Sequence, residues 1–192
     1  MSNLITFDEA KHEYRRVDSG LLVPSVTGII KNAGIINTDW IDDYYLERGK
    51  WVHLACEYYD LGCLDHNTVD DAISGFVQSY INFRQASPNV LIYPDGIEKI
   101  VYNPTWNYVG TVDRICMVNG LDAIIDLKSG SPARWHGLQL SGYSLALGGG
   151  YRRYGLYLHK DGKKGTLIEY DDQSDDDVFL GITNFNHWSK KR

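Results

Sequence analysis

Two aspartates and a lysine lie on two apolar segments that the dipeptide Asn119-Gly120 separates. Asn-Gly between apolar runs is the strongest short-range signal of a hairpin with a two-residue turn. With such a turn, Asp113 faces Asp126 directly, at a Cβ separation of about 4.5–5.5 Å, where like charges repel. A turn of four residues would place Asp113 opposite Lys128 instead. In either register, the three charged groups belong to one neighbourhood.

These charges suit phosphate chemistry. The segment Ile124–Lys128 predicts a strand, so Asp126 and Lys128 share one face while Leu127 points to the other. A divalent cation would take oxygen ligands from both aspartates and so offset their repulsion. The ammonium group of Lys128 could stabilise charge on a phosphate or orient an attacking water. The alternative interpretation is a surface salt bridge on an edge strand.

A histidine on a long predicted helix is the third candidate. His53 and Glu57 are four residues apart and therefore share a helical face, and Gly49 would leave room there for a strand or a ligand. A helical histidine is more often a packing residue than a ligand. The HExxH pattern of zinc proteases is missing, which excludes that class.

A fourth candidate follows the second strand. Gln139 and Tyr143 share a face of the next predicted helix. An amide and a phenol could contact phosphate oxygens, or they could hold the lysine and the carboxylates in place. The alternative is an amphipathic helix with two polar surface residues.

The elements that would position these residues form one α/β (α+β) domain over residues 1–192, with a central mixed sheet flanked by helices. Residues 4–23 indicate an antiparallel ribbon, and residues 87–95 are expected to be loop. Thr38 or Asp39 could cap the second helix. The predicted helices are 26–32, 40–61, 68–84, 134–147 and 175–190, and the predicted strands are 97–102, 108–118, 121–128, 151–159 and 165–170.

Composition narrows the class further. The chain has 192 residues, of which 43% are hydrophobic, and it has neither a membrane-span-like run nor an N-terminal apolar signal, so we expect a cytoplasmic protein. Three cysteines without CxxC spacing do not describe a disulfide framework or a zinc site. The net charge of −6 argues against an unselective nucleic-acid coat. Much of this negative charge lies in residues 169–177, and the basic residues lie elsewhere in the sequence.

Taken in order, the motifs resemble the RecB-like branch of the PD-(D/E)XK nucleases. They are Arg48-Gly49-x-x-x-His53, Gly110-Thr-Val-Asp113, Ile124-Ile-Asp126-Leu-Lys128 and Gln139-x-x-x-Tyr143. The upstream segment Val23–Ile30 is similar to the opening segment of phage exonucleases and of exonucleases of the mitochondrial genome maintenance type. The similarity extends from Pro24 to the C-terminal helix.

The resemblance implies a restriction-endonuclease-like core and hydrolysis of DNA that depends on Mg²⁺ or Mn²⁺. It also implies roles for individual residues. Two of them, Ser25 and Thr27, lie at a predicted helix N-terminus, which suits phosphate binding. The implied metal ligands are His53, Asp113, Asp126 and the Leu127 carbonyl; the catalytic residues are Lys128, Asp113 and Asp126, supported by Gln139 and Tyr143; and the DNA contacts are Ser25, Thr27, Arg48 and Trp135.

Two departures from the family pattern matter. Asp126 stands where the family name has Glu, and the extra cysteines of iron–sulfur members are missing, so no cluster is expected. An imidazole beside carboxylates is a softer ligand set than an all-oxygen Mg²⁺ site, which favours Mn²⁺ as an equal alternative.

The expected activity is exonucleolytic, from free DNA ends and with a preference for single strands. The expected setting is bacteriophage replication, recombination or repair in the cytoplasm of a host cell. A structure-specific endonuclease and a non-catalytic DNA-binding recombination accessory protein are the alternatives. Homo-oligomerisation and a separate helicase or single-strand annealing partner stay open.

Overall fold

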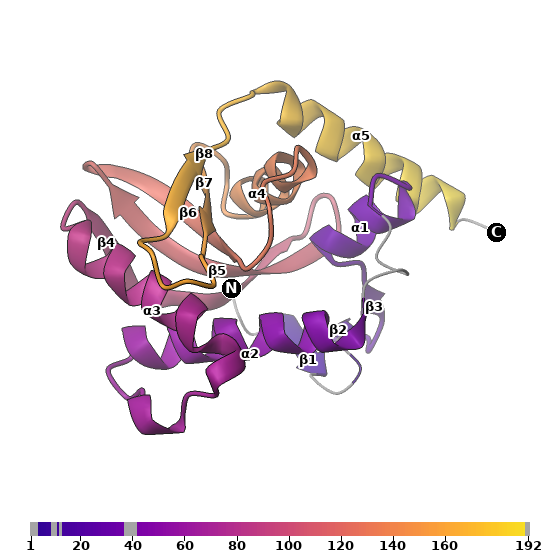
Figure 1. Ribbon diagram of the computed structural model, residues 1–192. Coiled ribbons are helices and arrows are strands. Elements are labelled where there is room, and N and C mark those ends of the chain that lie inside the picture. Colours follow the sequence, from indigo (N-terminus) through magenta and orange to yellow (C-terminus); the bar gives the residue numbers. More distant parts are fainter. Residues whose placement is uncertain (1–3, 9–10, 12, 37–41, 191–192) are drawn as a thin grey trace.

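The computed structural model describes residues 4–8, 11, 13–36 and 42–190 (Figure 1). Five strands form a mixed sheet in the order β4-β5-β6-β7-β8, and three short strands form a separate antiparallel sheet, β1-β2-β3. The strands are β1 (Ile5–Asp8), β2 (Glu13–Arg16), β3 (Leu22–Val23), β4 (Val90–Asn103), β5 (Tyr108–Val118), β6 (Leu121–Lys128), β7 (Arg152–Tyr157) and β8 (Thr166–Glu169). The helices are α1 (Val26–Asn32), α2 (Asp43–Asp60), α3 (Asp71–Ala86), α4 (Trp135–Ala146) and α5 (Ser174–Ser189), and a 3-10 turn spans His66–Thr68.

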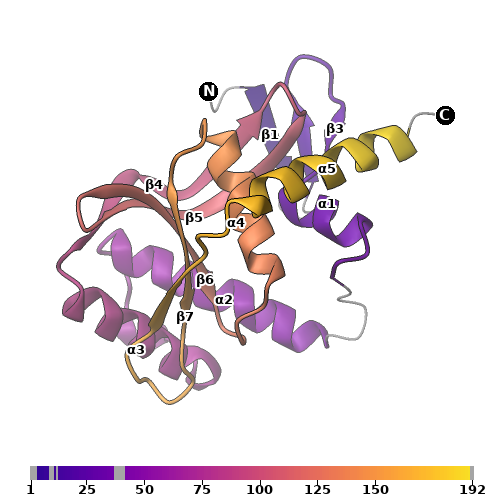
Figure 2. The ribbon, with the colours of Figure 1, turned by 90° about the horizontal axis from the view of Figure 1, so that it is seen from above.

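Helices cover both faces of the five-stranded sheet, as Figures 1 and 2 show. Helices α2 and α3 pack on one face through a core that includes Val52 and Phe76. Helices α1, α4 and α5 cover the other face through a core that includes Ile29, Leu140 and Phe179. The predicted α/β class with a mixed sheet flanked by helices is therefore confirmed.

The hairpin between β5 and β6 has the two-residue turn. Val118 pairs with Leu121, and the antiparallel register runs on to Arg114 opposite Ile125. Asn119 and Gly120 both have positive φ angles, 51° and 81°, as a type I′ turn requires. The alternative register with a four-residue turn is wrong.

Strand β6 lies inside the sheet, not at its edge. It pairs antiparallel with β5 and parallel with β7, and α4 forms the crossover between the two parallel strands. A parallel neighbour requires such a crossover connection. The interpretation of Asp126 and Lys128 as a salt bridge on an edge strand is therefore wrong.

Several boundaries differ from those expected. Strand β4 begins at Val90, because its first residues pair with the end of β5, whereas the sequence predicted loop up to residue 95. Helix α3 begins after an N-cap at Asp70, whose side chain accepts a hydrogen bond from Ala72. The proposed caps Thr38 and Asp39 lie outside the described residues, and the described part of α2 is capped by Asp42.

Within the part of the chain that the structure describes, no helix combines the length and the apolar character needed to cross a membrane.

Candidate active site

A cleft of about 1020 Å³ opens where α2 faces the N-terminal end of α1 and the middle of α4 across strands β4 and β5. Aromatic residues of the small sheet and of α2 form part of its lining, and polar residues form the rest. Its polar lining includes Ser25, Thr27, His53, Glu57, Glu98, Thr111, Asp113, Gln139 and Tyr143.

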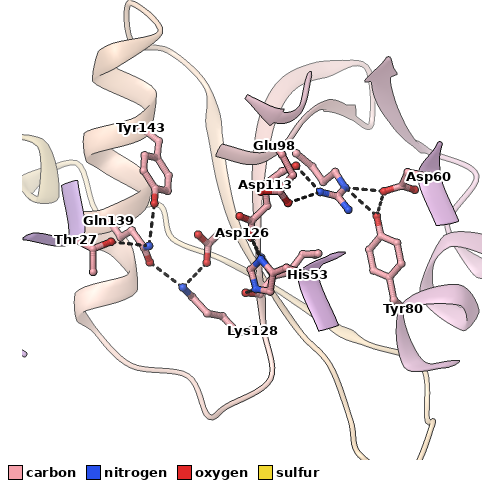
Figure 3. A network of polar contacts seen from close by, with 12 residues as sticks. Thr27, His53, Asp60, Tyr80, Glu98, Asp113, Asp126, Lys128, Gln139 and Tyr143 are labelled. Carbon is pink, nitrogen blue, oxygen red and sulfur yellow. Dashed lines mark hydrogen bonds and ion pairs between the residues drawn. The ribbon is translucent and has the colours of Figure 1, made fainter. Parts of the chain in front are cut away.

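The side chain of Asp113 is buried at one end of the β5–β6 pairing and contacts the main chain of β6. Its Oδ2 accepts a hydrogen bond of 2.6 Å from the backbone N–H of Leu127. The same oxygen lies 3.4 Å from Nδ1 of His53, while Nε2 of that ring lies 3.0 Å from the Leu127 carbonyl oxygen. His53 thus contacts two other predicted metal ligands, Asp113 through one ring nitrogen and the Leu127 carbonyl through the other, and Figure 3 shows His53 beside Asp113.

Asp126 and Lys128 form an ion pair beside this point. The lysine Nζ lies 2.5 Å from Oδ2 of Asp126 and donates a 2.8 Å hydrogen bond to Oε1 of Gln139. The amide nitrogen of Gln139 donates to the Tyr143 hydroxyl at 3.0 Å and to Oγ1 of Thr27 at 3.3 Å. One neutral amide therefore orients the lysine from the α4 side, and its own donors and acceptor are all used (Figure 3).

Glu98 joins the site from β4, and the motif analysis did not include it. Ligand atoms of His53, Glu98 and Asp113 all lie within 4.8 Å of one another. Glu98 has a positive φ of 45° and follows the irregular stretch between Ile92 and Ile97 in the β4–β5 pairing. Simple strand alternation predicts neither this backbone angle nor this side-chain direction, so no local sequence signal identifies Glu98.

The acidic groups perturb one another strongly. Burial and the nearby Asp113 raise the pKa of Glu98 to about 8, against the opposing effect of His53 and Arg114. Burial also raises the pKa of Asp126, an effect that Lys128 reduces only in part. Burial would raise the pKa of Asp113 as well, but His53, Lys128 and the Leu127 N–H together outweigh it and the net shift is downward. Three carboxyl groups thus compete for few positive partners.

The pKa of the His53 imidazole is raised, which favours its positively charged form. Burial by itself would lower its pKa, but the charge of Asp113 and its hydrogen bond raise the pKa to about 9. The cluster therefore favours positive charge at the position between Asp113 and the Leu127 carbonyl.

The donor set fits a divalent cation. One imidazole and two carboxylates within 4.8 Å, with a backbone carbonyl adjacent, match the ligands that Mn²⁺ takes, and Mg²⁺ takes the oxygens among them. Asp126, the fourth predicted ligand, contacts Lys128 and lies outside this group of three. The group that could hold an ion therefore includes Glu98, and Asp126 is not part of it.

Tyr143 packs closely against the strand that carries Asp113. A side-chain Cβ at Gly110 would lie only 2.4 Å from Cε1 of Tyr143. Glycine in the motif Gly110-Thr-Val-Asp113 thus permits the contact between α4 and β5. By contrast, a Cβ at Gly49 would meet open space at the cleft, consistent with the expectation of room on that face of α2.

Two of the four predicted DNA contacts line the cleft, one lies beside the site, and one packs elsewhere. Ser25 and Thr27 line the cleft at the start of α1, where the Ser25 hydroxyl caps the helix by accepting from the Gly28 N–H. Trp135 lies beside the site, with the Lys128 ammonium 5.4 Å from its ring centre. Arg48 is not in the cleft lining, and its guanidinium packs over the ring of Phe76 on α3 at 4.8 Å.

A scan against protein-family models finds no match for this chain, and a search of curated proteins finds no matching sequence. Motifs and geometry therefore carry the functional argument.

Proposed function

We propose that this protein is a metal-dependent deoxyribonuclease that hydrolyses DNA phosphodiester bonds at the cleft, as a relative of the RecB-like PD-(D/E)XK nucleases. The observation that carries the proposal is the proximity of His53 and Asp113, which line the cleft, to the Asp126–Lys128 ion pair on the neighbouring strand, which Asp113 adjoins through the Leu127 N–H. Mg²⁺ or Mn²⁺ would be held by His53, Glu98, Asp113 and the Leu127 carbonyl, and would supply Lewis acidity.

In this proposal, the chain's own residues divide the work. The ammonium group of Lys128 is held by Asp126 and Gln139 at a fixed position, where it stabilises negative charge on the phosphate or orients the attacking water. Thr27 and Ser25, at the N-terminus of α1, supply hydrogen-bond donors to phosphate oxygens. DNA is the proposed partner, and the cytoplasm the proposed location.

The test is cleavage of end-labelled DNA with Mg²⁺ or Mn²⁺, using Asp126→Asn and the matched variant Asp122→Asn. Both aspartates lie on β6, but Asp122 is exposed and bonded to the Tyr93 hydroxyl. We expect cleavage by the parent and by Asp122→Asn, and none by Asp126→Asn. Equal inactivity of all three proteins on every DNA form would contradict the proposal and favour a binding protein.

Substrate form separates the two nuclease types. We propose an exonuclease acting from free ends with a preference for single strands. Linear single strands, linear duplexes and closed circular single strands are compared under the same conditions. Cleavage of the closed circles would instead identify a structure-specific endonuclease.

A further inference from the structure

A second polar cluster lies behind the cleft, on the side of α2 and α3. Its centre is Arg114, whose side chain is fully buried. Its Nε donates a 2.6 Å hydrogen bond to Oδ2 of Asp60 at the end of α2, and its Nη1 donates at 3.0 Å to Oε1 of Glu98 on β4. The same Nη1 lies 2.6 Å from the Asp113 carbonyl oxygen. One guanidinium thus connects three elements that bear proposed ligands.

Asp60 is held from several directions. Its side chain is 2% exposed and accepts a hydrogen bond from the Tyr80 hydroxyl, and Arg84 forms an ion pair with it at 3.3 Å. Tyr80 and Arg84 are four residues apart on α3 and therefore share a face. The end of α2 is thereby anchored to α3 and to the sheet.

The geometry of α2 links this anchor to the site. His53 and Asp60 are seven residues, or about two turns, apart, so they project from the same face of the helix. Fixing Asp60 against Arg114 sets the rotation of α2 about its axis, and so determines where the His53 ring lies. A small rotation of α2 would break the contacts of His53 with Asp113 and the Leu127 carbonyl.

Glu98 depends on Arg114 even more directly. Its backbone has a positive φ, which a residue with a side chain adopts only when its surroundings hold it there. Arg114 donates a hydrogen bond to Oε1 of Glu98, and Oε2 forms no recognised hydrogen bond with the described residues. One oxygen of Glu98 is thus fixed by the arginine, and the other is left for a ligand in the cleft.

We propose that Arg114 and Asp60 are positioning residues that hold His53 and Glu98 in the metal-binding geometry. This inference rests on the proposed function. A buried ionic cluster is a poor way to gain stability, because apolar residues of similar volume often do as well or better. The energetic cost of burying these charges is consistent with a role in placing metal ligands. Mutation of residues that contact metal ligands commonly lowers metal affinity about 10–100-fold.

The test measures Mn²⁺ affinity by titration, separately from activity, together with the thermal unfolding midpoint. The variants are Asp60→Asn, which keeps the shape, and Arg114→Lys, which keeps the charge but lacks the fork that reaches both carboxylates. The matched control is Arg153→Met. Arg153 is also a buried arginine, bonded at 3.1 Å to Asp176, but unlike Arg114 it forms no recognised hydrogen bond or ion pair with His53, Glu98 or Asp113 among the described residues.

We expect all three variants to unfold at lower temperature, and only Asp60→Asn and Arg114→Lys to bind Mn²⁺ about 10–100-fold more weakly while still folded. A fourth variant, Arg114→Met, loses the charge as well and matches the substitution of the control; it should bind Mn²⁺ more weakly than Arg114→Lys. Parent-like Mn²⁺ affinity in folded Asp60→Asn and Arg114→Lys would overturn this inference alone. A parent protein that binds no Mn²⁺ would overturn the proposed metal centre, and this inference with it.

Discussion

On the β6–α4 wall of the site, one neutral amide joins two hydroxyl groups to the lysine of the Asp126–Lys128 ion pair, whereas on the α2–β4 wall one buried guanidinium joins two carboxylates. Gln139 connects Lys128, Tyr143 and Thr27 by hydrogen bonds of 2.8–3.3 Å. Arg114 connects Asp60 and Glu98 through charged contacts of 2.6 and 3.0 Å. The contacts of the β6–α4 wall fix the position of the lysine ammonium group, and those of the α2–β4 wall hold carboxylates close to one another.

This difference suggests a division of labour. The neutral amide of Gln139 orients the ammonium group of Lys128 through a hydrogen bond and adds no charge to this wall. A fully buried guanidinium offsets part of the repulsion between nearby carboxylates and so allows them to approach one another. We therefore expect changes on the β6–α4 wall to affect the chemical step, and changes on the α2–β4 wall to affect metal affinity.

Among the changes that distinguish the two walls, the largest effect is expected from Lys128→Met. The variant removes the ammonium group that would stabilise charge on the phosphate, and we expect DNA cleavage to fall by roughly 10²–10³-fold. Mn²⁺ affinity should stay within about threefold of the parent, because Lys128 is not a ligand. A parallel loss of Mn²⁺ affinity in titrations would break the distinction between the walls.

Glu98→Gln tests the opposite wall. The amide keeps the size of the side chain but loses the charge, and we expect Mn²⁺ affinity to fall about 10–100-fold, similar to changes around other metal ligands. Activity should recover in part at high Mn²⁺ concentration. Unchanged affinity would remove Glu98 from the ligand set and leave the originally predicted set, with Asp126, as the alternative.

A change at Gln139 is expected to have an intermediate effect. Gln139→Leu leaves Lys128 and the Tyr143 hydroxyl without their shared partner, and we expect a loss of about 1–2 kcal/mol in the free energy of unfolding. Cleavage should decrease while Mn²⁺ affinity is retained. Chemical denaturation and Mn²⁺ titration of the same samples measure both quantities. Parent-like cleavage by this variant would show that the lysine needs no orienting amide.

Thr27→Val is expected to have the smallest effect on stability. It removes a single 3.3 Å hydrogen bond from Gln139 and keeps the shape, so we expect a change of about 0.5 kcal/mol in unfolding free energy. A larger effect on DNA binding than on stability would support Thr27 as a phosphate contact. Equal, small effects on both would restrict it to supporting Gln139.

Local sequence was informative wherever one strand or one turn decided the outcome. Asn119-Gly120 predicted the two-residue turn, and the register that follows brings Asp113 and Asp126 to the same end of the strand pair. The 124–128 alternation predicted that Asp126 and Lys128 share a face, and the two side chains form an ion pair, from which Lys128 also reaches Gln139 of α4. Turn geometry and strand alternation are local properties, so neighbouring residues determine them.

Local sequence patterns did not predict the contacts between segments that are distant in the sequence. Residue types and spacing by themselves determined the fold class, the hairpin and the pairing of an acid with a lysine on β6. Only the tertiary structure decided that Glu98 joins His53 and Asp113 and that Arg114 reaches Asp60. These outcomes depend on a positive φ in β4 and on how α2 packs against the sheet, and neither is encoded in any one stretch of residues.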